Sequence, residues 1–196
     1  MQVEQWDTFL QRLLDGSRAA IREFAAQHPS EEVCDFAYDS EPCCGYVLTC
    51  FNTTKANVKH VKEHHDYQLA QRKRVLAMPS WRAAAYYQVR SHGVVPFCNN
   101  TGYFAYQGFS DIQFPEWESF AQSEEYPKPE SHEDAYLMSR AALIFAQSLD
   151  TLTEDGSFEV LGLASPTLLG FGFHDEPHCV VRMLRLPEAE PRLTSR

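Results

Sequence analysis

Two groups of histidines are the residues with the clearest potential for metal or catalytic chemistry. His60 and His64 are four residues apart in a segment that we expect to be helical, so their side chains share one helix face. Glu63 and Asp66 lie beside them, but Val61 occupies the position where the zinc-enzyme pattern H-E-x-x-H has its glutamate. The pattern leaves a metal site and a solvated polar helix face as alternatives.

The second group is His174, Asp175, Glu176 and His178, followed by Cys179. Imidazole, carboxylate and thiolate groups can bind a divalent metal, so one hypothesis is a metal-dependent enzyme that uses this cluster. The alternative is a polar turn between two strands, because Asp and Pro are typical turn residues.

Other catalytic motifs are not found in the sequence. It contains no phosphate-binding glycine loop and no G-x-S-x-G elbow. A nucleophilic pair of Cys98 with His92 has no local support, since a reactive thiolate requires an activating environment. We therefore predict a protein that is not an enzyme and that uses no metal and no cofactor.

The segment from Asp111 to Asp134 concentrates negative charge beside aromatic side chains. It contains eight acidic residues and one lysine, and three prolines predict that much of it is irregular. Aromatic side chains anchor many protein interfaces, and carboxylates steer a basic partner toward them. The alternative is that Trp117 and Phe120 fill the core beneath an acidic loop. The candidate partner-binding residues are Asp111, Glu116, Trp117, Glu118, Glu124, Glu125, Tyr126 and Glu130.

The overall charge restricts the class of partner. The formal net charge is −10, which opposes binding to nucleic acid and favours a basic protein. Between Lys55 and Arg90, in contrast, eight basic residues accompany two acidic ones. This basic segment directly precedes the acidic one, so the two can also pair within the fold.

The sequence predicts a cytoplasmic protein. Met1 to Leu14 mixes charged and apolar residues unlike a secretory signal, and no apolar run reaches the roughly 18 residues of a membrane span. We therefore expect its six cysteines to be reduced.

Apolar periodicity predicts the elements that must position these groups. Apolar residues at three- and four-residue steps predict a helix from Trp6 to Phe24, ended by His28-Pro29. The other expected helices are 54–78, 80–89 and one from a capping box at Ser131; the expected strands are 33–38, 45–51, 158–163, 168–173 and 179–186, with short strands and turns in 91–109. This order predicts one α+β domain over residues 1–187, with a mainly antiparallel sheet and helices packed on it, and a frayed tail over 188–196.

Several short motifs resemble those of a bacterial family called domain of unknown function 4303. They are Ala25-Ala26-Gln27-His28-Pro29, Phe36-Ala37-Tyr38, Gly45-Tyr46-Val47, Asn52-Thr53, Arg140-Ala141-Ala142-Leu143, Leu149-Asp150, Gly156-Ser157-Phe158 and Arg185-Leu186-Pro187. These motifs are helix faces, strand cores and turns. The segment 79–129 departs from the family pattern, which would make it the partner-specific part.

The resemblance implies an immunity protein of a polymorphic toxin or type VI secretion system. Such a protein binds a cognate toxin in the cytoplasm and blocks its active site. An acidic, aromatic surface would fit a basic toxin such as a nuclease. The alternatives are the metal-dependent enzyme of the His174–His178 cluster and a regulatory module with another protein partner.

Overall fold

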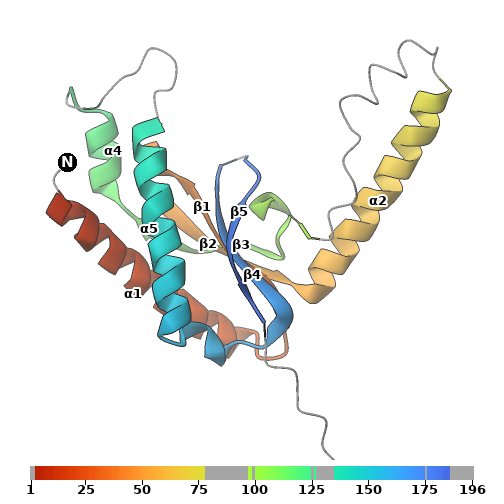
Figure 1. The fold of residues 1–196 in the computed structure, drawn as a ribbon, viewed down its shortest axis with the longest axis horizontal. Helices are drawn as coiled ribbons and strands as arrows, with labels where there is room; N and C mark the ends of the chain where they lie inside the picture. Colours follow the sequence, from red (N-terminus) through yellow and green to blue (C-terminus); the bar gives the residue numbers. More distant parts are fainter. Residues whose placement is uncertain are drawn as a thin grey trace, which may run out of the picture.

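A computed structural model describes residues 3–77, 97–98, 100–124, 126, 135–174 and 176–185. It contains a five-stranded sheet with the strand order β3-β2-β1-β4-β5 (Figure 1). Strands β1 and β4 are parallel, and the other neighbouring pairs are antiparallel. The predicted α+β class with a mainly antiparallel sheet is therefore confirmed.

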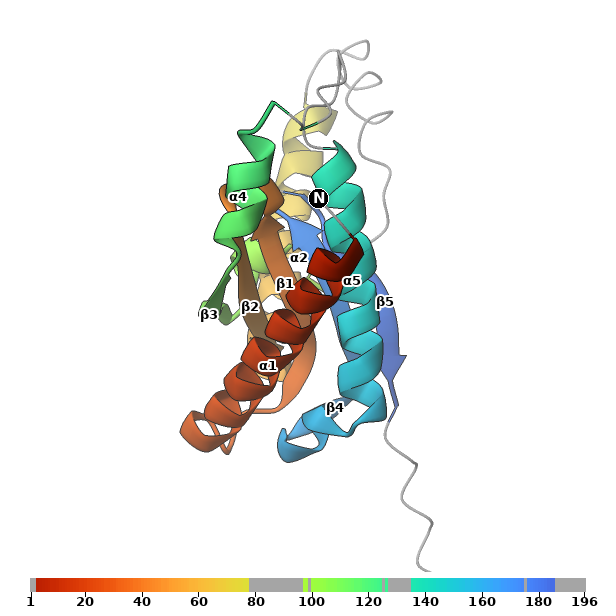
Figure 2. The same ribbon diagram turned by 90° about the vertical axis from the view of Figure 1, so that its left-hand side faces the viewer.

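Helices α1 (Val3–Gln27) and α5 (Ala135–Glu154) cover one face of the sheet (Figures 1 and 2). The predicted apolar stripe of α1 is buried through Phe9, Leu13, Ile21 and Phe24. A buried hydroxyl network connects this layer to the sheet, because the Tyr38 hydroxyl lies 2.8 Å from the hydroxyls of both Ser17 in α1 and Ser148 in α5.

The predicted hairpin forms the centre of the sheet. It consists of β1 (Val33–Glu41) and β2 (Tyr46–Thr53), joined by a short 3₁₀ turn, η1 (Pro42–Cys44). At the other end of the chain, β4 (Leu163–Phe173) and β5 (Cys179–Leu184) form the second predicted hairpin. The prediction of a strand over 158–163 is wrong, since Ser157–Val160 is a 3₁₀ helix, η3, that follows the turn at Gly156.

Helix α2 (Thr54–Leu76) lies on the opposite side of the sheet and extends away from it (Figure 1). It confirms the helix expected over 54–78. The side chains of Val58, Tyr67 and Leu69 are exposed, as is expected for a segment with poor apolar periodicity. The expected helix 80–89, the capping box at Ser131 and the tail 188–196 lie outside the described residues.

The acidic segment contains more regular structure than its prolines predict. β3 (Tyr106–Gln113) pairs with β2, and α4 (Pro115–Ala121) follows it directly. Pro115 occupies the start of α4, where its missing N–H costs nothing and its fixed φ favours the helix. The expectation of an irregular backbone is therefore wrong for residues 111–113 and 115–121 of this segment.

Candidate functional site

The aromatic residues of the acidic segment are in the core. Trp117 is fully buried and stacks on Phe114 with a ring-centroid separation of 4.5 Å. It also meets Phe9 of α1 edge to face at 5.6 Å, and Tyr126 is buried as well. Selecting Trp117 and Tyr126 as surface anchors is therefore wrong, because α4 turns Trp117 toward α1 and Tyr126 is buried against Phe120.

The acidic residues of the same segment are exposed. Asp111 lies near the end of β3, Glu116 and Glu118 lie on α4, and Glu124 follows that helix. Glu125 and Glu130 lie outside the described residues. The structure thus separates the predicted set into exposed carboxylates and buried rings.

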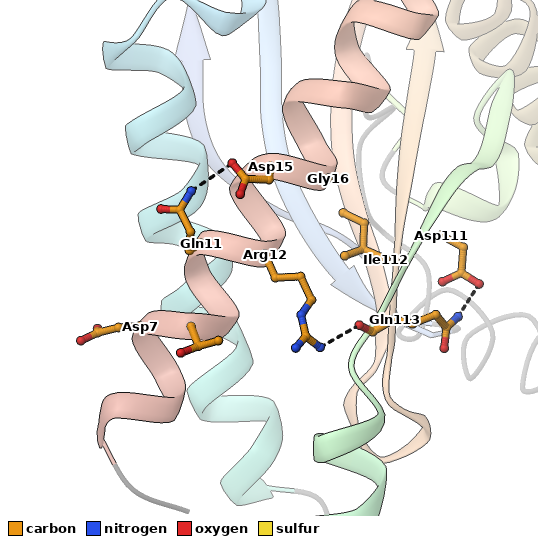
Figure 3. Close-up of a pocket in the computed structure, with 9 residues that line it drawn as sticks. Asp7, Gln11, Arg12, Asp15, Gly16, Asp111, Ile112 and Gln113 are labelled. Carbon is orange, nitrogen blue, oxygen red and sulfur yellow. Dashed lines mark hydrogen bonds between the residues drawn. The ribbon is translucent and has the colours of Figure 1, made fainter.

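A groove of about 910 Å³ runs between α1 and β3, beside these carboxylates (Figure 3). Its lining residues are Asp7, Thr8, Gln11, Arg12, Asp15, Gly16, Asp111, Ile112 and Gln113. Gly16 allows the helix to approach the strand, since a Cβ there would lie 2.7 Å from Ile112 Cδ1. The groove contains three carboxylates and one guanidinium, so it favours cationic groups.

Arg12 shows how the groove binds a guanidinium. Its Nη1 and Nη2 atoms donate to the two carboxylate oxygens of Glu116 at 2.9 and 2.8 Å. Nη1 also donates to the backbone carbonyl of Gln113 at 3.2 Å. The hydrogen bond from Arg12 lowers the pKa of Glu116 below its ordinary value. Sequence reasoning selected Glu116 but missed Arg12, because 104 residues separate the pair.

The described helices of the acidic and basic segments, α4 and α2, do not face each other. Figure 1 shows α4 and α2 on opposite sides of the sheet. Glu116 pairs with Arg12 of α1, and Lys59 of α2 pairs with Glu63 of the same helix at 3.9 Å. Helices α4 and α2 therefore present charged side chains of opposite sign to different sides of the molecule.

The predicted histidine clusters do not assemble a metal site among the described residues, where no group of three or more potential ligands is found. The His60 and His64 rings are 6.1 Å apart, and His60 stacks on Tyr103 at 4.7 Å. His174 Nδ1 lies 4.0 Å from Asp39, whereas His178 Nε2 lies 3.3 Å from Asp35. Asp175 lies outside the described residues.

The described surroundings of Cys98 disfavour a reactive thiolate. It is buried, and burial raises the pKa of its thiol above the ordinary value. The thiol is 3.3 Å from the carbonyl of Asn100, and the backbone N–H of Cys98 donates to Asn57 of α2. A raised pKa disfavours the thiolate that a nucleophile needs. His92 lies outside the described residues.

Asp35 and His178 form a buried polar pair that the sequence analysis did not predict. The Asp35 and His178 side chains are 2% and 1% exposed, and burial raises the pKa of Asp35 well above its ordinary value. The imidazole of His178 packs closely against Gly170 of β4. A Cβ at position 170 would lie 2.8 Å from the imidazole Cδ2. The alternation Gly170-Phe171-Gly172 was the available signal, since glycines in a strand often permit close approach of another segment.

We expect Gly170→Ala to destabilise the protein by about 1–3 kcal/mol, the usual cost of overpacking, because the new methyl group collides with the backbone carbonyl of Cys179 and with the His178 ring. Urea denaturation monitored by circular dichroism measures this change. The control is Ala164→Gly near the start of β4, which removes a methyl group where Gly170→Ala adds one. It should lower the free energy of unfolding by at most about 1 kcal/mol. Equal stability of Gly170→Ala and the parent protein would contradict the close approach.

Comparison with protein-family models, curated proteins and solved structures gives no significant match. The described residues also include no helix that is long and apolar enough to cross a membrane.

Proposed function

We propose that this chain is an immunity protein that binds a basic toxin through the groove between α1 and β3. The observation that carries the proposal is the groove itself, which Asp7, Asp15 and Asp111 line together with Arg12, whose guanidinium binds Glu116 and the Gln113 carbonyl at its edge. The sequence resemblance supplies the class of partner, and the acidic groove supplies a physical reason for its charge.

Carboxylates on an exposed surface mainly increase the rate of association with a basic partner. Long-range attraction steers a basic partner to the groove, and salt screens that attraction within about 10 Å at 0.1 M ionic strength. The groove is therefore proposed to determine encounter and orientation. The partner's nuclease or other active site would be covered by the surrounding surface of α1, β3 and α4.

The proposal predicts the effect of reversing charge in and beside the groove. The triple variant Asp7→Lys, Asp111→Lys, Glu118→Lys should lower the association rate with the toxin by about tenfold or more at low salt. The difference should shrink at high salt. Surface plasmon resonance against the product of the neighbouring gene, the toxin that the resemblance implies, measures both.

A matched triple variant controls for net charge. Glu63→Lys, Glu159→Lys and Glu176→Lys change the same number of exposed carboxylates on α2, η3 and the β4–β5 turn. This control should bind with nearly the parent rate. Equal losses in the two triples would show that only net charge matters, and binding unchanged in both would exclude the groove as the interface. Binding of a different protein in place of the toxin would favour the regulatory module.

A further inference from the structure

The floor of the groove includes one edge of the sheet. Among the described residues β3 is an end strand, and its pairing with β2 matches Val47 with Ile112 and Leu48 with Asp111. In an antiparallel pair, the backbone groups of successive residues point alternately toward and away from the neighbouring strand. The orientation of this edge can therefore be deduced from a few hydrogen bonds.

Two contacts fix the alternation. The N–H of Phe114 donates to Gly45 at the start of β2, so Phe114 points toward β2. The carbonyl of Gln113 instead accepts from Arg12, which lies in the groove. Gln113 and, two residues earlier, Asp111 therefore direct their backbone N–H and C=O groups away from β2. Both residues line the groove, so these groups face its interior.

Two elements, α1 and β3, place negative charge beside the β3 edge of the sheet. Asp7 and Asp15 lie on the α1 side of the groove, and Asp111 lies on the strand itself (Figure 3). An extended segment beside β3 would turn every second side chain toward α1. Arginine or lysine at those positions would face Asp7 and Asp15, whereas Asp111 projects from the opposite face of the sheet, because its neighbour Ile112 faces Gly16 of α1.

The other end strand of the sheet has a different chemistry. β5 consists of Cys179, Val180, Val181, Arg182, Met183 and Leu184, and it contains no acidic residue. Val180 and Met183 are 44% and 48% exposed, and Arg182 binds Asp150 of α5. A basic segment thus has electrostatic complementarity with the β3 edge and not with β5.

We propose that an extended basic segment of the partner protein adds to β3 as a sixth strand of the sheet. Its backbone would pair with Asp111 and Gln113, and its alternate basic side chains would lie on the α1 side of the sheet, toward Asp7 and Asp15. In the partner-free protein, Arg12 donates a hydrogen bond to the Gln113 carbonyl. Arg12 would give up this hydrogen bond when the partner strand binds. This inference rests on the proposed function, for which it names the form of the partner at the groove.

The test uses a synthetic peptide with alternating arginines, acetyl-Arg-Thr-Arg-Val-Arg-Thr-Arg-amide, and the full protein. Two analogues carry backbone N-methyl groups, one on all arginines and the other on the intervening residues. An added strand uses alternate N–H groups only, so one analogue should lose about tenfold in affinity and the other should bind nearly as the parent peptide does. Nuclear magnetic resonance titration gives the affinities and also the amide-exchange rates of Asp111 and Gln113, which should slow.

The protein side has its own matched variants. Gln113→Pro removes an N–H that points away from β2, whereas Gln113→Ala removes only the side chain. Gln113→Pro should weaken binding of the parent peptide by about tenfold relative to Gln113→Ala, with both proteins folded by circular dichroism.

The outcomes separate the two proposals. If both N-methyl analogues bind as tightly as the parent peptide and the charge-reversed triple binds weakly, the groove binds basic groups without strand pairing; the inference falls and the proposed function stands. Equal weakening by both analogues also overturns strand pairing. If no peptide shifts the groove resonances and the toxin binds the charge-reversed triple normally, both proposals fall.

Discussion

Trp117→Ala is expected to destabilise the protein by about 3–5 kcal/mol, which is a large part of the total stability of a domain. The side chain is fully buried between Phe114, Phe9 and Trp6, so truncation leaves a cavity between α4 and α1. Urea denaturation measures the loss directly.

Trp117→Phe separates a core role from a binding role. The indole Nε1 is buried without a hydrogen-bond partner among the described residues, so phenylalanine forfeits no hydrogen bond. It should cost much less than alanine and leave toxin binding unchanged. Tenfold weaker binding by a stable Trp117→Phe protein would instead make Trp117 an interface residue. A loss below 1 kcal/mol for Trp117→Ala would contradict its place in the core.

Asp35→Asn is expected to change how stability depends on pH. Burial raises the pKa of Asp35 in the folded protein, so the folded chain retains a proton that the unfolded chain has released. Stability from this group is complete below the unfolded pKa of 3.8 and is lost as pH rises through the folded pKa. The loss approaches about 1.4 kcal/mol for each pH unit within that window. Asparagine cannot ionise, so Asp35→Asn removes this loss of stability at higher pH.

The measurement is the free energy of unfolding of the parent and Asp35→Asn at pH 5 and pH 8. The titratable neighbours of Asp35 are His178 from the β4–β5 turn, Cys34 on β1, Cys50 on β2 and Cys98. Asp35→Asn should gain stability relative to the parent as pH rises. Parallel pH profiles of the two proteins would show that Asp35 ionises normally in the fold.

Acid sensitivity should come from other carboxylates. Hydrogen bonds from Arg12 and Arg182 lower the pKa of Glu116 and Asp150, and a hydrogen bond from Ser157 does the same for Asp155. Their stabilising contributions are present above their ordinary pKa values and are lost as pH falls through the lowered ones. These three groups therefore titrate mainly below pH 5, so they contribute little to the difference between pH 5 and pH 8 that the Asp35→Asn comparison measures.

The opposite charges of the two sides of the sheet have a consequence for binding. The acidic groove and the basic helix α2 point in different directions, so the molecule has an electrostatic orientation as well as a net charge (Figure 1). A basic partner approaching from the α2 side is repelled locally despite the overall charge of −10. For the proposed basic partner, orientation of this kind would favour encounters on the groove side.

The sequence alone determined the elements with strong local signals. Apolar periodicity located α1, and the turn residues located the β1–β2 and β4–β5 hairpins, because these signals arise from residues close together in the chain. Local reasoning failed at Ser157–Val160, where apolar and acidic residues alternate but form a 3₁₀ helix. Composition also located the acidic segment and its exposed carboxylates.

Only the tertiary structure decided which side of that segment faces solvent. Trp117 and Glu118 are adjacent in sequence, yet packing of α4 on α1 buries the first and exposes the second. The groove likewise requires Arg12 and Glu116 to meet, and the buried pair requires Asp35 and His178 to meet. Contacts between residues so distant in the chain depend on how the helices pack on the sheet. The charge and periodicity of a single segment do not specify this packing.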